Sequence, residues 1–218
     1  MIITEQKPMD EILDMLAAHE AVYLVGCPIC ATTWGTGGEP EVDQMMADLE
    51  AAGKQCRGRL VPDEGVCDRR ITRLGLRREK DQLAQADAVL VLSCGAGVQT
   101  VAEMVSVATY PALNTLFLAR LQSLAVSDER CRLCGDCVLA DTGGICPVTL
   151  CPKGLANGPC GGYMEGKCEV DKQQDCAWVL IHQRLQELGQ EDRFLAIREP
   201  KDWSKARHPR LVDKRAAR

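Results

Sequence analysis

The sequence predicts an α/β fold in its first half and a small, cysteine-rich domain in its second. Between residues 9 and 126, short apolar runs alternate with stretches of helical periodicity, which is typical of a parallel, doubly wound sheet. Beyond residue 127 that pattern stops, and eight of the 13 cysteines lie between residues 131 and 176. We therefore expect a flavodoxin-like α/β domain over residues 1–126 and a cysteine-rich domain with a terminal helix over residues 127–190.

The elements of the first domain follow from apolar spacing and length. Helical spacing predicts helices over residues 9–19, 40–52, 77–86 and 98–107. Short apolar runs predict strands over residues 21–26, 58–61, 87–93 and 113–119, of which the run DAVLVLS (87–93) is the clearest. Each expected strand except the last is followed by an expected helix, so the strands should run parallel with helices on both faces.

The second half is too poor in apolar residues to fold on side-chain packing alone, so we expect bound metal to staple it. The segment CAWVLIHQRLQELG (176–189) predicts a helix, with Gly189 as its C-cap. One face of this helix carries Trp178, Ile181, Leu185 and Leu188. The tail, residues 191–218, is polar and basic. We expect an extended arm that docks on a partner; a frayed end or a tail folded back on its own domain is the alternative.

Composition excludes several classes of protein. The net charge is −5 and 46% of residues are hydrophobic, which is ordinary for a globular protein and gives no general basic face for nucleic acid. The longest apolar runs are too short to span a bilayer. The first residues, MIITEQKPMDEIL, do not resemble a signal peptide, so we expect a cytoplasmic protein without a membrane partner.

The cysteines are the main candidates for chemistry. In a reducing cytosol, grouped cysteines are more often metal ligands than disulfides. The three histidines lie outside every cysteine group, which favours all-thiolate sites. No residue stands out as a catalytic acid, base or nucleophile, so we expect a subunit that is not itself catalytic.

The segment CRLCGDC (131–137) places Cys131, Cys134 and Cys137 two residues apart, as in the first part of a bacterial ferredoxin motif. Cys146 and Cys151 are each followed by proline, as the last cysteine of that motif is. This triple favours an iron–sulfur cluster over zinc held by four thiolates. With Cys160, Cys168 and Cys176, the half has enough ligands for a second site, a cluster or a structural zinc, and the pairing stays open.

A further group is expected at the edge of the sheet. Cys27 and Cys30 follow the strand 21–26, and Cys94 follows the strand 87–93. The carboxyl ends of parallel strands meet at one edge, so these cysteines should converge there, with Cys67 as a fourth ligand. Cys56 is better explained as a small buried hydrophobe.

Two other interpretations of this edge are weaker. CPIC (27–30) has the spacing of a thiol–disulfide enzyme, but we expect no helix start beside it, and the neighbouring cysteines suit co-ligands better. WGTGG (34–38) and CGAG (94–97) could cradle a phosphate, yet neither completes a dinucleotide fingerprint.

From CPKGLANGPCGG (151–162) onward the sequence resembles a known family, the cysteine-rich C-terminal domain of methylenetetrahydrofolate reductases. Matching segments are TGGICP (142–147), GKCEV (166–170) and DCAW (175–178). The first half is similar to MetV-type small subunits of these enzymes in VGCPIC (25–30), TGGE (36–39), SCGAGVQ (93–99) and YPALNT (110–115).

The resemblance implies an iron–sulfur electron-transfer subunit that accompanies MetF, a flavoprotein that reduces methylenetetrahydrofolate to methyltetrahydrofolate in one-carbon metabolism and the Wood–Ljungdahl pathway. It implies two or three [4Fe-4S] clusters, with zinc possible at one site. The implied electron donor is ferredoxin or a larger electron-bifurcating complex. The ligand positions that it implies are Cys27, Cys30, Cys67, Cys94, Cys131, Cys134, Cys137, Cys146, Cys151, Cys160, Cys168 and Cys176. Many relatives carry a further cysteine where this chain has Trp34, which makes Cys67 the best replacement. The rival function is a zinc-stapled adaptor that stabilises MetF without electron transfer.

Overall fold

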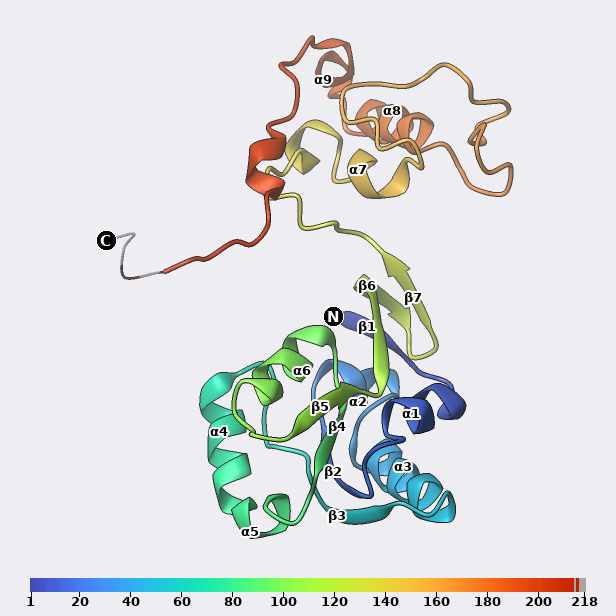
Figure 1. Ribbon diagram of the computed structural model, residues 1–218. Coiled ribbons are helices and arrows are strands. Elements are labelled where there is room, and N and C mark those ends of the chain that lie inside the picture. Colours follow the sequence, from blue (N-terminus) through green and yellow to red (C-terminus); the bar gives the residue numbers. More distant parts are fainter. Residues whose placement is uncertain (214, 216–218) are drawn as a thin grey trace. The chain divides into compact units, whose positions relative to one another are not determined.

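The computed structural model describes residues 1–213 and 215. The chain divides into two compact units, Met1–Asp128 and Glu129–Arg218 (Figure 1). Each unit is described by itself below. Among the described residues, no helix is both long and apolar enough to cross a membrane.

The first unit is built on a parallel four-stranded sheet. Its strands are β2 (Ala21–Gly26), β3 (Gln55–Leu60), β4 (Ala88–Leu92) and β5 (Ala108–Pro111), in the order β3-β2-β4-β5. This order matches the first four strands of the flavodoxin-like order 2-1-3-4-5, so the α/β prediction is confirmed. The strands β2 and β4 are wholly buried, which explains why they read as continuous apolar runs.

Helices cover both faces of this sheet, as the alternating pattern predicted (Figure 1). The helices α1 (Met9–Met15) and α3 (Glu39–Ala51) lie on one side of it, and α4 (Arg69–Arg78) and α6 (Gly95–Ala102) lie on the other. Two shorter helices, α2 (Cys30–Trp34) and α5 (Lys80–Leu83), complete the unit. The core between the layers is a single large cluster that includes Ile12, Tyr23, Leu49, Leu90 and Val101.

Several boundaries differ from the sequence-based prediction. The helix expected over residues 77–86 begins earlier, at Arg69, and breaks between α4 and α5. Its start was missed because the buried face of α4 consists of Thr72, Gly75 and Leu76, which give little apolar periodicity. The helix expected over 98–107 is α6, which ends at Ala102 and leaves residues 108–111 free to form β5.

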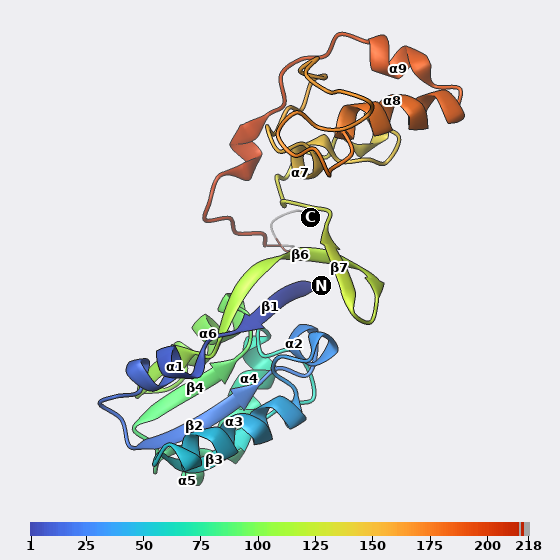
Figure 2. The same cartoon turned by 90° about the vertical axis from the view of Figure 1, so that its right-hand side faces the viewer.

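A second, three-stranded sheet was not predicted. It consists of β1 (Ile2–Gln6), β6 (Leu113–Ser123) and β7 (Val126–Glu129), in the order β1-β6-β7. The N-terminal strand β1 runs antiparallel to β6, with Ile2 opposite Leu118 (Figure 2). The pairing joins residues more than 100 positions apart, and such partners cannot be found from local periodicity.

The second unit has little regular structure. Its elements are η1 (Leu139–Asp141), α7 (Pro147–Leu150), α8 (Ala177–Glu187), α9 (Glu191–Leu195) and η2 (Trp203–Ala206). The buried cluster of this unit is formed by Trp178, Ile181 and Leu185, all on α8. The predicted helix and its apolar face are therefore confirmed, except that Leu188 is exposed rather than buried.

Candidate metal centres

The first candidate site lies at the carboxyl ends of β2 and β4. These strands are neighbours, and Gly26 at the end of β2 pairs with Leu92 at the end of β4. Cys27 follows the first strand directly, Cys30 begins α2, and Cys94 is the N-cap residue of α6. Strand order reverses between β2 and β4, and this is the position where open α/β sheets bind their ligands.

Cys27 is held in place by its backbone. Its N–H donates to the carbonyl oxygen of Gly37 at 2.8 Å, and its carbonyl oxygen accepts from the Thr32 hydroxyl at 2.8 Å. A Cβ added at Gly37 would lie 2.2 Å from the carbonyl oxygen of Leu92, so only glycine allows the loop to approach the sheet edge this closely. Gly37 thus serves close packing at the site. The Gly38 N–H donates to the Glu41 carboxylate, which takes the place that a phosphate oxygen would have in a phosphate-binding turn.

The loop after β3 brings Cys67 to the same site. Burial raises the pKa of the Cys67 thiol, and the charges of Cys94, Cys27 and Cys30 raise it further. A Cβ added at Gly65 would lie 3.5 Å from the Cys67 sulfur and 3.6 Å from the Ile29 side chain, so the loop of Cys67 lies beside the segment that carries Cys27 and Cys30. Cys56 lies apart: it packs beside the core, and burial followed by the nearby charge of Glu50 raises its pKa to about 11.

The structure corrects one argument made from the sequence. A helix does begin at Cys30, whereas none was expected there, because the five-residue segment CATTW carries no apolar periodicity. A strand, a Cys-x2-Cys segment and a helix therefore follow one another. The case against a thiol–disulfide enzyme now rests on Cys67 and Cys94, which lie beside the pair and suit co-ligands.

A second group of cysteines lines one cavity in the second unit. Cys151, Cys160, Cys168 and Cys176 all face a cavity of about 10 Å³, which also contacts Trp178. Cys176 is the N-cap residue of α8, and Cys151 follows the end of α7. Four of the eight C-terminal cysteines thus line one cavity.

Backbone hydrogen bonds shape the loops around this cavity. The N–H of Cys168 donates to Gln174 at 2.9 Å, and the N–H of Cys176 donates to Gly166 at 2.8 Å. The Cys160 sulfur accepts from the Gly162 N–H at 3.4 Å, and this bond lowers the pKa of the Cys160 thiol, with a smaller contribution from the charge of Lys153. Donors aimed at sulfur favour the thiolate, which is the form that binds metal.

The remaining four cysteines, Cys131, Cys134, Cys137 and Cys146, precede or begin α7. Leu133 and Gly135 have φ values of 55° and 79°, which place left-handed residues on both sides of Cys134. The Leu133 N–H donates to the Cys131 sulfur at 3.4 Å, and the Thr149 hydroxyl donates to the Cys146 sulfur at 3.5 Å. Loops in which left-handed residues turn amides inward form concavities for anions, iron–sulfur sites among them.

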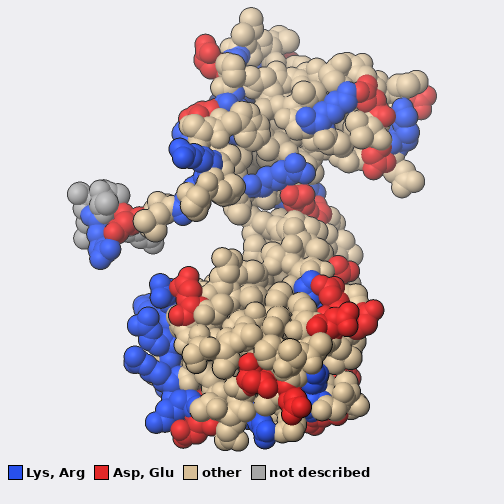
Figure 3. Space-filling view, viewed as in Figure 1, with Lys and Arg blue, Asp and Glu red and all other residues tan. Residues whose placement is uncertain are grey.

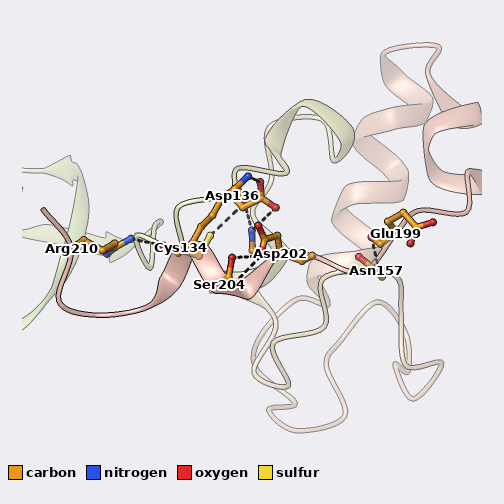
Figure 4. Close-up of polar contacts among 9 residues, drawn as sticks. Cys134, Asp136, Asn157, Glu199, Asp202, Ser204 and Arg210 are labelled. Carbon is orange, nitrogen blue, oxygen red and sulfur yellow. Dashed lines mark hydrogen bonds and ion pairs between the residues drawn. The ribbon is translucent and has the colours of Figure 1, made fainter. Parts of the chain in front are cut away.

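The C-terminal tail packs against this loop (Figure 4). The Lys201 ammonium donates to the carbonyl oxygen of Asp136 and its side chain is only 1% exposed. Lys205 donates to the Asp136 carboxylate at 3.0 Å, and this bond lowers the pKa of that carboxyl. Arg210 donates to the carbonyl oxygen of Leu133 at 2.8 Å. These three cations, here called the tail clamp, were missed by the sequence analysis because their partners lie more than 60 residues away.

The contacts of the tail clamp concern the same segment that was expected to be a partner-docking arm. In the described part of residues 191–218, the tail folds back on its own unit, which is the alternative named above, and docking on a partner stays a prediction. Exposed apolar side chains nevertheless remain on it, including Ile197 and Leu211.

The donor set fits an all-thiolate metal centre. Among the described residues, no three His, Cys, Asp or Glu side chains are placed so that they could hold a metal ion. A cluster separates its thiolates more widely than one ion does, because iron and sulfide atoms lie between them. The cysteines near the sheet edge offer thiolates, which are the ligands that iron–sulfur sites use.

The fold and its thiol groups define a cysteine-rich α/β protein of two units. Residues 110–204 match a family described as "Methylene-tetrahydrofolate reductase C terminal". The resemblance indicated by the sequence is confirmed over this segment, which contains all eight C-terminal cysteines and none of the sheet-edge group. No curated protein and no solved structure matches the chain.

Proposed function

We propose that this chain is the iron–sulfur electron-transfer subunit of a methylenetetrahydrofolate reductase. The main support is the position of Cys27, Cys30 and Cys94, which follow the carboxyl ends of the neighbouring strands β2 and β4 at the switch point of the sheet. The loop of Cys67 lies beside the segment of Cys27 and Cys30. The family match of residues 110–204 supports the link to the reductase. Four thiolates from distant loops have no structural purpose in a well-packed α/β unit, but they suit a redox centre at its edge.

The proposal assigns ligands to three sites. Cys27, Cys30, Cys67 and Cys94 would hold the first. Cys131, Cys134, Cys137 and Cys146 would hold the second, with the tail clamp fixing its loop. Cys151, Cys160, Cys168 and Cys176 would hold the third. When bound, such clusters carry single electrons. Reduction of the folate would belong to a flavin-bearing MetF partner, and ferredoxin or a larger electron-bifurcating complex would supply the electrons.

One observation favours zinc at the third site. The cavity among its four cysteines measures about 10 Å³, room for roughly one water molecule. A single ion would need the thiols only to close inward, whereas a cluster would need the loops to open. A zinc staple here fits the small core of the second unit, and it is compatible with electron transfer through the other two sites.

Metal and sulfide analysis of protein purified without oxygen tests the proposal. We expect iron and acid-labile sulfide in equal amounts, a brown colour that bleaches on reduction, and zinc at no more than one atom per chain. Cys94→Ser should remove one cluster and leave zinc unchanged, whereas Cys168→Ser should release the metal of the third site alone. A colourless protein that contains zinc and no iron would establish the adaptor function instead.

A further inference from the structure

The helix α4 carries an unusual concentration of positive charge. Its ten residues, RRITRLGLRR, include five arginines and no acidic residue, in a chain whose net charge is −5. We call Arg69, Arg70, Arg73, Arg77 and Arg78 the arginine face. Figure 3 shows Lys and Arg side chains gathered along the side of the first unit where Figure 1 places α4.

Most of this charge is not neutralised within the unit. Arg69 pairs with Glu103 at 3.4 Å and Arg70 pairs with Asp68 at 2.7 Å. Arg73, Arg77 and Arg78 are exposed, and no acidic residue in the described part of the chain pairs with them. Three arginines in one helix without counter-charges repel one another, so stability of the unit does not explain them.

A groove of mixed character lies beside the arginine face. It is lined by the end of β3, the segment after it and α4. Its apolar residues are Leu60, Val61, Pro62, Ile71 and Leu74, and its charged residues are Asp63, Arg78 and Glu79. Leu74 is 49% exposed, although it lies in the middle of a helix whose other face is buried. Arg78 borders the groove. An exposed leucine beside arginines is typical of protein–protein interfaces. Asp63 and Glu79 also line the groove, so the positive charge lies on the arginine face itself and not inside the groove.

The position of α4 connects this surface to the first candidate site. Cys67 is exposed and immediately precedes Asp68, the N-cap residue of α4. A protein seated on the arginine face would therefore lie beside one of the four proposed ligands. No aromatic side chain lines the groove, so it offers no stacking platform for the bases of a nucleic acid.

We propose that the arginine face and its groove form the docking surface for an acidic electron-carrier protein. This rests on the proposed function, because the carrier gives one electron to the centre held by Cys27, Cys30, Cys67 and Cys94. In each encounter the carrier is oxidised by one electron and the centre is reduced by one. The arginines steer the approach of the carrier, and the groove buries an apolar part of its surface.

Binding of a reduced bacterial two-cluster ferredoxin, an acidic protein, to the full metal-loaded chain tests the surface. We expect Arg73→Glu/Arg77→Glu to weaken binding at low salt by about tenfold or more, since both reverse charge on an exposed face. The matched control is Lys172→Glu/Arg207→Glu, two exposed cations of the second unit whose reversal changes the net charge equally. It should change binding by less than about twofold. Leu74→Ser should weaken binding at both low and high salt.

Stopped-flow reduction separates docking from the metal centres. Reduced ferredoxin should bleach Arg73→Glu/Arg77→Glu more slowly than the unsubstituted protein, whereas dithionite should bleach both equally. A protein that dithionite does not bleach would refute the iron–sulfur function, while the binding measurement would still decide the docking surface. Unchanged ferredoxin binding in Arg73→Glu/Arg77→Glu, or an equal loss in the control, would overturn the proposal. So would a single-stranded oligonucleotide that binds more tightly than ferredoxin through the same arginines.

Discussion

Gly37 shows how one residue controls the geometry of the sheet-edge site. It accepts the hydrogen bond from the Cys27 N–H, and its Cα faces the carbonyl oxygen of Leu92, two residues before Cys94. The residue thereby holds together the two strand ends from which the thiols project. Gly95 lies at the same edge, in α6, but a Cβ there would have its nearest neighbour at 3.8 Å.

We expect Gly37→Ala to lower the free energy of unfolding by about 1–3 kcal/mol, because the methyl group would press on backbone atoms that cannot move aside. The variant should also retain less iron at the first site. Gly95→Ala is the matched control and should be neutral or stabilising by about 0.5–1 kcal/mol, as alanine favours a helix. Urea denaturation with iron analysis measures both. Equal stability of the two variants would show that Gly37 does not fix the edge.

At the level of elements, the tail acts on a loop far from it in the sequence. The tail clamp attaches residues 201–210 to the loop of Cys131, Cys134 and Cys137 through two carbonyl oxygens and one carboxylate. Lys201 is the buried member, and its ammonium also lies 5.5 Å from the centre of the Trp203 ring. A buried positive charge that is bonded to this loop stiffens it, and it would stabilise added electrons if the loop holds a cluster.

We expect Lys201→Met to speed amide exchange in residues 131–137 and to cost about 1–3 kcal/mol, because the Asp136 carbonyl loses a charged donor. If the second site holds a cluster, its reduction potential should become more negative, since a nearby positive charge is lost. Arg207→Met removes an exposed cation of the same segment that has no ionic partner among the described residues, so it should change neither property. Exchange mass spectrometry and a redox titration provide the measurements. Unchanged exchange in Lys201→Met would contradict the role of the clamp.

At the level of the whole molecule, the two units depend on different sources of stability. The first unit has a large apolar core between a buried sheet and its helices. Among its described residues, the second has a buried cluster of Trp178, Ile181 and Leu185, with Ile145 and Phe194 packed against it, although its loops carry eight cysteines. So small an apolar core does not offset the entropy lost by ordering such long loops.

We therefore expect metal removal to affect the units unequally. In the full chain treated with a chelator, residues 21–113 should keep slow amide exchange in their strands, whereas residues 131–176 should exchange as an unfolded segment does. Restoring iron and sulfide, or zinc for the third site, should return protection to the second unit. Slow exchange throughout residues 131–176 in the metal-free protein would show that side-chain packing suffices there.

The sequence by itself determined what depends on local pattern. Local pattern predicted the buried strands β2 and β4 and the helices α3 and α8, because buried positions recur at the spacing of a strand or a helix. It also predicted that cysteines follow the ends of strands, since they come directly after the apolar runs. The α/β class followed from the same patterns, whereas the resemblance to the reductase family came from motifs such as CPKGLANGPCGG (151–162).

Only the tertiary structure decided which distant residues meet. It paired β1 with β6 and brought the loop of Cys67 to the segment of Cys27 and Cys30. It also placed Cys151, Cys160, Cys168 and Cys176 around one cavity and joined the tail clamp to Asp136. It also exposed the arginine face of α4, whose buried side is too weakly apolar to mark the helix start. The physical reason is common to all of these. Contacts between segments far apart depend on chain topology and packing, which no window of neighbouring residues contains.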